Sequence, residues 1–302
     1  MLRFAARHGR WCLIAGLVAG LTLPGLAGAL RSALPHMIAA LLFLAAFRVG
    51  PQAILRGLRS DFTVVRLVLI FQVLAPLIAL GASHALGVSG STAALAAVLM
   101  LSAPSVTGSP NFALIMGVRP EAALRLLMVG TALLPLTILP VLSLIPDLDT
   151  GAVVFAAGRL IVVVGLAGGV AFLLRRGRWA RLTTAQEQNL DGASAILLGV
   201  VVIGLMSAVG PLLTSAPLVF GMWLAFAAAL NFSAQLLAWK SIAKLAPAED
   251  RPAISVVAGN RNIALFLVAL SPDITTDLLS FIGCYQIPMY LTPILFQRFY
   301  RR

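Results

Sequence analysis

The chain is a succession of long apolar segments separated by short connections that carry most of its charge. A bilayer crossing needs about 20 mainly apolar residues, and unbroken runs such as LLGVVVIGLM lack the alternation of membrane β-strands. Charge clusters and Pro/Gly breaks delimit ten segments, near residues 11–30, 34–50, 64–87, 92–116, 122–145, 151–174, 192–212, 216–239, 252–270 and 277–297. With 60% hydrophobic and 11% charged residues, an ordinary soluble enzyme is excluded. We expect an all-α polytopic membrane protein with ten transmembrane helices.

Most basic residues lie at the termini or in alternate connections; the exceptions are Arg31, in an intervening connection, and Arg159 and Arg261, inside segments. Nineteen of the 22 fall in the two termini or in every second connection, namely Arg3, Arg7, Arg10, Arg48, Arg56, Arg59, Arg66, Arg119, Arg125, Arg175, Arg176, Arg178, Arg181, Lys240, Lys244, Arg251, Arg298, Arg301 and Arg302. Lys and Arg mark the cytoplasmic side, so we expect a multi-pass protein of the inner (cytoplasmic) membrane with both termini in the cytoplasm. The net charge of +12 is then a topology signal, and the expected partner is the lipid bilayer rather than nucleic acid.

Two interruptions lie at matching positions of two halves, residues 1–147 and 148–302, each with five segments. The fourth segment contains APSVTGSPN (103–111), and the ninth contains VVAGNRNIA (256–264). Because five is odd, the second half would be inverted relative to the first, as in many secondary transporters, whose binding sites lie at such interruptions. Irregular backbone within the bilayer must face protein or a cavity. For one interruption taken alone, a kink that improves packing is the alternative.

Residues 104–111 and 257–262 carry a resemblance to a known family. They read PSVTGSPN and VAGNRN, and they resemble the Pro-Gly-Gly-Thr-Ala-Ser-Asn and Glu-x-Gly-x-Gln-Asn stretches in the fourth and ninth helices of the bile acid:sodium symporter family. Gln72 and Thr131, each four residues before a Pro, match further family positions. The chain is therefore similar to a divergent, bacterial-type member of that family over nearly its whole length.

The resemblance implies a panel domain and a core domain, with broken helices 4 and 9 crossing in the core. It also implies a secondary transporter that moves a small organic anion across the membrane by alternating access. The candidate substrate-binding residues are Thr107, Ser109, Asn111, Asn260, Arg261, Asn262 and Gln286. The positions equivalent to the family's ion sites are Gln72, Thr131, Val257 and Arg261. Polar residues at the interruptions could equally satisfy backbone groups freed by the prolines, and the two roles can coexist.

Three departures from the family concern its sodium sites. Val257 stands where the family has a Glu, Arg261 where it has a Gln, and Leu127 where it has a Ser. All ten acidic residues fall in or next to connections. We therefore expect transport without sodium coupling of the family's usual kind. An intramembrane charge costs about 2.5–3.5 kcal/mol on insertion scales and usually finds a partner, so we expect Arg261 to meet carbonyls of the broken helices or an anionic ligand.

Three alternative functions remain open at this point. They are a sodium-coupled symporter, an ion channel and an intramembrane enzyme. A channel usually surrounds a symmetry axis with identical groups, whereas this chain has two unlike interruptions. An enzyme needs an activated nucleophile or a metal, and no intramembrane acid or His pair is present in the sequence. We expect no catalytic residue, no metal site and no cofactor, and the identity of any coupling ion stays open.

Overall fold

A computed structural model of the chain describes residues 1–51, 62–145, 148–176 and 179–300. Every regular element within these ranges is a helix. Five of the basic residues that indicate the topology lie outside the described residues, namely Arg56, Arg59, Arg178, Arg301 and Arg302. So does residue 147, at which the two expected halves meet.

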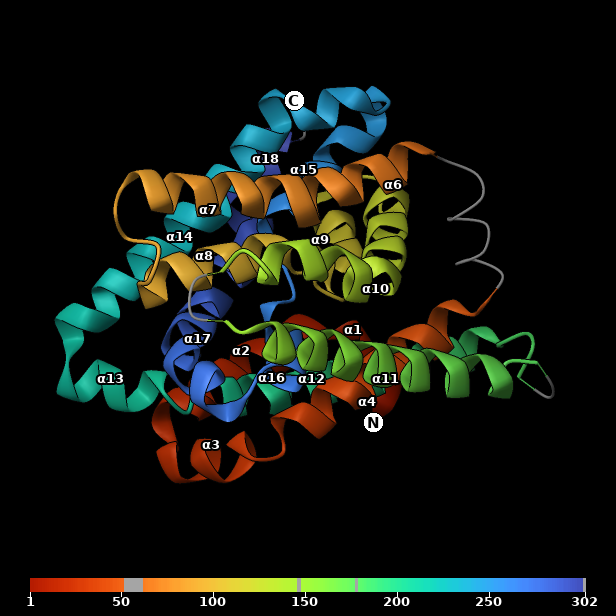
Figure 1. Cartoon of the computed structure of the whole chain (residues 1–302). Coiled ribbons are helices and arrows are strands. Elements are labelled where there is room, and N and C mark those ends of the chain that lie inside the picture. The colour runs from red at the N-terminus through yellow and green to blue at the C-terminus, as the bar shows by residue number, and fades with distance from the viewer. Residues whose placement is uncertain (52–61, 146–147, 177–178, 301–302) are drawn as a thin grey trace.

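The helices pack into two bundles, which form the lower and upper layers of Figure 1. The first bundle contains α1 (Leu2–Arg7), α2 (Gly9–Thr22), α3 (Pro24–Arg31), α4 (Leu34–Val49), α11 (Thr150–Leu174) and α12 (Thr184–Leu205). The second contains α6 (Phe62–Leu69), the π-helical turn η1 (Ile70–Leu74), α7 (Ala75–Ala85), α8 (Thr92–Ser102), α9 (Ser109–Met116), α10 (Glu121–Leu142), α14 (Pro217–Lys240), α15 (Arg251–Gly259), α17 (Pro272–Leu295) and α18 (Gln297–Tyr300). Each bundle therefore draws helices from both halves of the sequence.

Short elements connect the two bundles. Helix α13 (Val209–Ser215) leads from α12 to α14, and α16 (Phe266–Ala269) packs against α4 and α11 of the first bundle. Three 3-10 turns complete the described helices: η2 (Ile242–Leu245), η3 (Ala248–Asp250) and η4 (Ile263–Leu265). The chain from α15 to α17 thus crosses from the second bundle to the first and back, and it does so at the ninth apolar segment.

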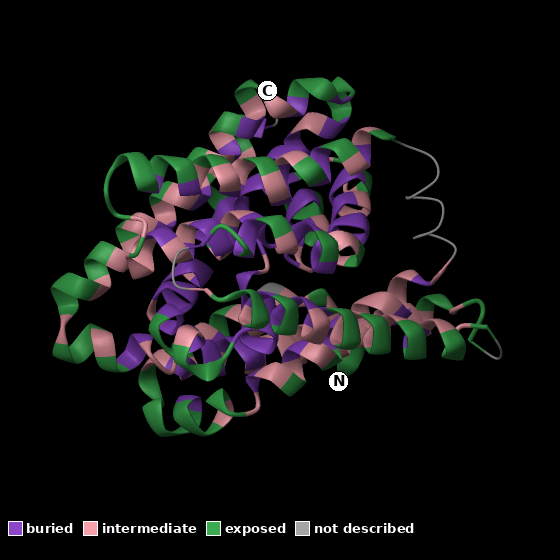
Figure 2. Ribbon diagram, viewed as in Figure 1, coloured by how far each residue is buried: buried purple, intermediate pink, exposed green. Residues whose placement is uncertain are grey.

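Six described helical stretches are long and apolar enough to cross a bilayer, and a bent pair makes a seventh. The six are 62–85, 121–142, 150–174, 184–215, 217–245 and 272–295. The other expected segments are shorter pieces: α4 in the second, α8 and α9 in the fourth, and α15 to α16 in the ninth. Many large apolar side chains of the spanning helices are exposed, and Figure 2 shows exposed positions in green along the outer sides of both layers. Several apolar helices with such faces indicate a polytopic membrane protein.

The first apolar segment is bent rather than straight, so the expectation of one helix over 11–30 was wrong. Its two parts, 11–22 and 24–31, meet at an angle of 105°. A proline disfavours the helical conformation of the residue before it, and Leu23 adopts φ −120° and ψ 70° ahead of Pro24. Pro24 then begins α3, where its missing N–H has no helical partner to lose.

Helix α12, which forms the seventh apolar segment, begins at Thr184, eight residues before the expected start at 192. Thr183 and Gln186 form a capping box at its N-terminus, in which the Gln186 N–H donates to Thr183 Oγ1 (3.3 Å) and the Thr183 N–H donates to Gln186 Oε1 (2.9 Å). A capping box satisfies two N–H groups that a helix start otherwise leaves free. The polar first turns of α12 therefore extend an otherwise apolar helix beyond what hydropathy alone predicts.

Glycines set the close approach of α2 to α12 in the first bundle. A Cβ added to Gly16 would lie 2.4 Å from the Gly199 carbonyl oxygen, and one added to Gly199 would lie 2.9 Å from the Cys12 carbonyl oxygen. Small residues at such seams let helix backbones pack closely in membranes. These glycines therefore let α2 and α12 pack backbone against backbone.

Helices α10 and α17 share a pattern of internal prolines in the second bundle. Pro135 and Pro140 lie within α10, and Pro288 and Pro293 lie within α17. Each proline removes one backbone donor and leaves a carbonyl to find another partner. The same spacing thus occurs in the fifth segment of each half.

Candidate functional site

The two interruptions meet in space. The fourth segment is broken between α8 and α9 at 103–108, and the ninth between α15 and η4 at 260–262. Ser105 and Arg261 form an isolated antiparallel bridge. The Val106 N–H donates to the Asn260 carbonyl (3.0 Å), and the Asn262 N–H donates to the Pro104 carbonyl (2.8 Å). Two backbone hydrogen bonds therefore join the segments that the sequence singles out.

Arg261 is buried at this junction, and only 3% of the residue's surface is exposed to solvent. Its Nη2 donates to the carbonyl oxygens of Phe71 (3.0 Å) and Leu101 (3.1 Å). Its guanidinium carbon lies 5.0 Å from the centroid of the Phe71 ring. Of the two partners that the sequence allowed, the structure thus supplies carbonyls.

Those two carbonyls have a common structural origin. Leu101 belongs to the last turn of α8, where carbonyls have no partner within the helix and the helix dipole is negative. Phe71 belongs to the π-helical turn η1, a local distortion of the helix. Arg261 therefore supplies positive charge and donors where a broken helix and a distorted helix both expose acceptors.

Tyr285 is a junction residue that sequence reasoning missed. Its hydroxyl accepts from the Arg261 backbone N–H (2.9 Å) and donates to the Gly259 carbonyl. The Gly259 carbonyl also accepts from Asn231 Nδ2 (2.6 Å). The only signal in the sequence was the position of Tyr285 beside the candidate Gln286 in the tenth segment.

A small cavity lies against the junction. Four of the candidate substrate residues line it, namely Thr107, Arg261, Asn262 and Gln286. Its volume of about 30 Å³ holds one or two water molecules. The hydroxyl of Tyr290, which also lines the cavity, and Nε of Arg261 have no hydrogen-bond partner within the described chain. The cavity thus offers unused donors beside a buried cation.

A larger cavity of about 420 Å³ adjoins the small one and shares Thr107 and Leu42 with it. It lies between α4 and α11 of the first bundle and α10 of the second. Its volume falls within the range of about 300–1,000 Å³ typical of ligand pockets. Thr107 and Thr131 are the polar side chains in its lining. Thr107 therefore links a polar junction to an apolar cavity.

The remaining candidate substrate residues lie elsewhere. Ser109 is buried and accepts from Ser105 Oγ (2.8 Å). Asn260 is buried, its Nδ2 donates to the Val256 carbonyl (2.7 Å), and its amide oxygen accepts from Asn231 and Thr292. Asn111 is exposed on α9 and lines neither cavity. Ser109 and Asn260 thus match the alternative in which polar residues satisfy groups within the protein, whereas Asn111 matches neither role.

The positions equivalent to the family's ion sites do not gather around one cavity. Gln72 is buried, donates to the Gly130 carbonyl (3.1 Å) and accepts from Thr137 Oγ1 (2.9 Å). Val257 is buried in an apolar cluster. Thr131 lines the larger cavity. Within the described part of the chain, no group of three or more His, Cys, Asp or Glu residues is placed to hold a metal ion.

A polar network in the second half joins α14 to α17 and to the interruption. Gln235 Nε2 donates to Asn231 Oδ1 (2.7 Å) and to Thr292 Oγ1 (3.0 Å), and Thr292 Oγ1 donates to Asn260 Oδ1 (3.1 Å). All four residues are fully buried. Asn231 and Gln235 are single polar residues in an apolar segment, and interhelical hydrogen bonding is their ordinary use.

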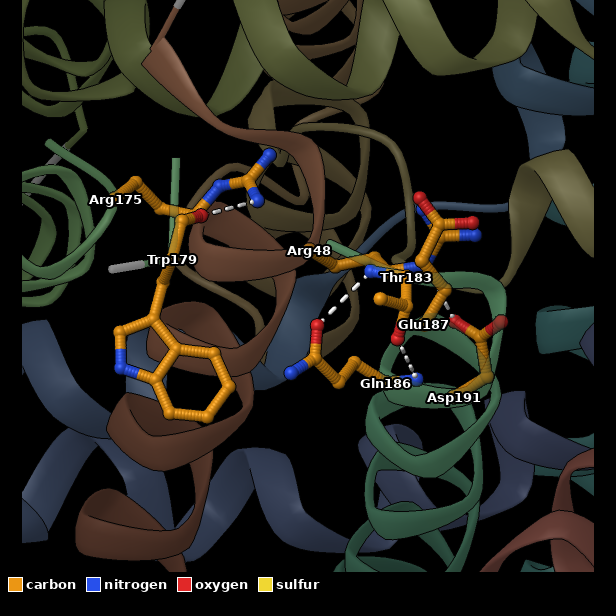
Figure 3. A network of polar contacts seen from close by, with 7 residues as sticks. All are labelled: Arg48, Arg175, Trp179, Thr183, Gln186, Glu187 and Asp191. Atoms are coloured by element: carbon orange, nitrogen blue, oxygen red, sulfur yellow. Dashed lines mark hydrogen bonds and ion pairs between the residues drawn. The ribbon is translucent and has the colours of Figure 1, made fainter. Parts of the chain in front are cut away.

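Charged residues cluster away from the junction, at the ends of helices. Figure 3 shows Arg48 beside Glu187 (3.4 Å) and Asp191 (2.9 Å), and Arg175 Nη1 donating to the Trp179 carbonyl (2.8 Å). The Arg48 pairs join the end of α4 to the start of α12, and the Arg175 contact lies within the residues after α11. They lie within the first bundle.

The second bundle has ion pairs of its own. Arg125 pairs with Asp250 (2.8 Å). The nearby carboxylates of Glu249 and Glu121 raise the pKa of Arg119. The Arg119 pairs are exposed, and pairs of that kind contribute little to stability. Neither cluster joins one bundle to the other.

Comparison of the sequence with models of protein families and with curated proteins found no match.

Proposed function

We propose that this protein is a secondary transporter of a small organic anion, embedded in the cytoplasmic membrane with ten crossings and both termini in the cytoplasm. The observation that carries the proposal is the meeting of two interrupted segments around the buried Arg261. Such a junction is typical of secondary transporters, whose substrate sites lie where discontinuous helices of two repeats meet.

The internal similarity of the two halves supports inverted repeats. The third and eighth segments are each a single long helical stretch, at 62–85 and 217–245. The fourth and ninth are the interrupted pair, and the fifth and tenth carry the matching prolines. With five segments in each half, this order requires the second repeat to be inverted in the membrane.

The arrangement of the bundles supports alternating access. The larger cavity lies between bundles that are each held by their own helix packing. It reaches Thr107, and through it the small cavity at the junction. A rigid shift of one bundle against the other changes the side from which Thr107 is reached.

The charges and donors at the junction favour an anion. The buried guanidinium of Arg261 has no acidic partner within the described residues, and Arg stays protonated in proteins. The small cavity adds the Tyr290 hydroxyl, the Asn262 amide and the Thr107 hydroxyl. A carboxylate near Thr107 would meet several donors and a permanent positive charge.

The same charge argues against sodium coupling. A cation 4 Å from the guanidinium would be repelled by about 4 kcal/mol at an effective dielectric constant of 20. The carbonyls of Phe71 and Leu101, which could ligate a cation, already bind Arg261. We propose that Arg261 is a resident cation that takes the place of a coupling sodium ion.

The proposal is tested in two steps. Purified protein is first screened by thermal unfolding against a panel of mono- and dicarboxylates, since a ligand of the folded state raises the midpoint. The anion with the largest shift is then used for uptake into proteoliposomes. Saturable uptake that falls in Thr107→Val, with unchanged folding, supports the proposal. Stabilising anions that are never taken up, or uptake that is unchanged in Thr107→Val, would contradict it.

A further inference from the structure

One charged side chain inside a spanning helix takes no part in the junction. Arg159 lies on α11, a helix of 25 residues whose most apolar stretch is only 22% buried. Its Cα lies nine residues after Thr150, which is about 13–14 Å along the helix axis at 1.5 Å per residue. The midpoint of α11 is three residues further on. When α11 crosses a bilayer, Arg159 is therefore close to the middle depth, where a charge is costly and usually has a partner.

Arg159 lacks the kind of partner that Arg261 has. Within the described chain it makes no hydrogen bond and no ion pair, and its one aromatic contact is the Phe155 ring, whose centroid lies 5.7 Å from the guanidinium carbon. Arg159 is half-buried, yet none of its nitrogen atoms is among the enclosed polar atoms that lack a partner. Its guanidinium donors are therefore open to whatever surrounds α11.

The side of α11 that carries Arg159 is apolar and exposed. Phe155, Val162 and Leu166 are 65%, 55% and 62% exposed, and their spacing places them on the same side of the helix as Arg159. Phe155 lies one turn nearer to the start of α11, and helical side chains lean toward the N-terminus of their helix. The guanidinium is therefore directed, along a surface that lipid covers, toward the membrane face at which α11 begins.

An anion supplied by the membrane is the partner that fits this position. The acidic residues of the chain all fall in or next to connections, so neither this chain nor a second copy of it offers a carboxylate at this depth. The anionic group that a phospholipid bilayer itself supplies is the phosphate of its head groups. Guanidinium and phosphate match in geometry as well as in charge, because two parallel N–H groups bind two phosphate oxygens.

We propose that Arg159 binds the phosphate of a phospholipid in the leaflet in which α11 begins. The head group is drawn inward to the level of the Phe155 ring, and the acyl chains lie along the exposed side of α11, past Val162 and Leu166. Arg159 lines neither cavity, so the lipid is a fixed neighbour of the protein and not its cargo. The inference goes beyond the proposed function and does not require the protein to transport anything.

The test is photo-crosslinking in liposomes with a phosphatidylglycerol that carries a diazirine at the start of one acyl chain, close to the head group. Labelling of the wild type is expected in the peptide covering 152–162. In Arg159→Met this labelling should fall about tenfold, equivalent to about 1.4 kcal/mol, and in the matched control Arg176→Met it should stay within about twofold of wild type. Arg176 is a suitable control because it is an exposed arginine just beyond the other end of α11, so its loss removes the same charge.

Three further arms identify the phosphate and its source. A diacylglycerol with the same photoreactive chain has no phosphate, so it should label wild-type 152–162 several-fold less than the phospholipid and should not respond to Arg159→Met. Arg159→Lys keeps the charge and should keep most of the labelling, which separates loss of the charge from loss of the fold. Inorganic phosphate in the buffer should not compete, because the site lies within the bilayer.

Three results would each overturn the proposal. They are equal labelling of wild type and Arg159→Met, equal labelling by the phospholipid and the diacylglycerol, and competition by inorganic phosphate. The second result would mean that water rather than a lipid phosphate satisfies Arg159. Transport is measured in none of these arms, so their failure is distinct from failure of the transport proposal.

Discussion

The two interruptions differ in how their polar groups are used. The first, at 103–108, presents the Thr107 hydroxyl to both cavities. The second, at 260–262, is packed against α14 and α17, where the network of Asn231, Gln235 and Thr292 reaches Asn260. Both interruptions line the small cavity, but only the first also reaches the larger one, whereas the second is anchored by hydrogen bonds to α14 and α17.

The ends of the two half-helices differ in the same way. The Leu101 carbonyl at the end of α8 is bound by the charged Arg261, while the Gly259 carbonyl at the end of α15 is bound by the neutral Asn231 and Tyr285. A neutral donor satisfies a carbonyl without adding charge. The charge is thus placed where the first interruption begins, and we expect its removal to have the largest effect on the fold.

Of the variants considered, Arg261→Met should lower the unfolding free energy most. It leaves the carbonyls of Phe71 and Leu101 without their donor, and an unsatisfied buried group costs about 1–3 kcal/mol. We expect a loss of about 3 kcal/mol in unfolding free energy in detergent. Arg159→Met is the matched control, because Arg159 is half-buried, lies 5.7 Å from the Phe155 ring and donates no hydrogen bond within the described chain. Equal stability of the two variants would mean that the carbonyl contacts do not hold the junction.

A pair of Thr→Val variants sharpens the comparison between the interruptions. Thr292 is fully buried and hydrogen-bonded to Gln235 and Asn260, so Thr292→Val should lower the unfolding free energy by about 1–2 kcal/mol. Thr107 faces cavities, so Thr107→Val should change it by less than about 0.5 kcal/mol. The measurement is unfolding of both purified variants under one set of conditions. If Thr107→Val proved the more destabilising, the assignment of the two roles would be reversed.

The smallest effect is expected at Asn111. This residue is exposed on α9 and lines neither cavity. Asn111→Ala should leave the unfolding midpoint and anion binding within error of wild type, since surface substitutions usually change stability by less than about 0.5 kcal/mol. Loss of anion binding in this variant would show that α9 contributes to the site in another conformation.

The sequence predicts helix positions and interruptions because their causes are local. Apolar runs define the helices, and the cluster around Pro104 and Pro110 predicts the break between α8 and α9. The polar partners of Arg261 are not local. Phe71 and Leu101 are 190 and 160 residues away along the chain, and they act through main-chain oxygens that have no sequence signature. The bend at Pro24 has a local cause too, but a proline within an apolar run gives no measure of the angle.

The candidate site residues likewise fall into two groups, those that the sequence predicts and those whose place only the fold determines. Thr107, Arg261, Asn262 and Gln286, all named from the interruptions and the family resemblance, meet at one small cavity. Asn111 satisfies the same motif yet lies outside, because helical phase on α9 decides its direction. Tyr285 was missed because a tyrosine in an apolar segment is ordinarily a packing residue. The pairing of 104–106 with 260–262 fixes the site, and pairing between distant segments is a property of the fold.

We propose that Arg261 is a resident cation that replaces a coupling sodium ion. The most direct test is the initial rate of uptake into proteoliposomes of the anion found by thermal screening, measured in sodium buffer and in choline buffer. If Arg261 replaces sodium, wild-type uptake should have the same rate in both buffers, and uptake by Arg261→Gln should be markedly slower. A steep rise of wild-type uptake with sodium concentration, or an Arg261→Gln variant that transports as fast as wild type in choline, would contradict it.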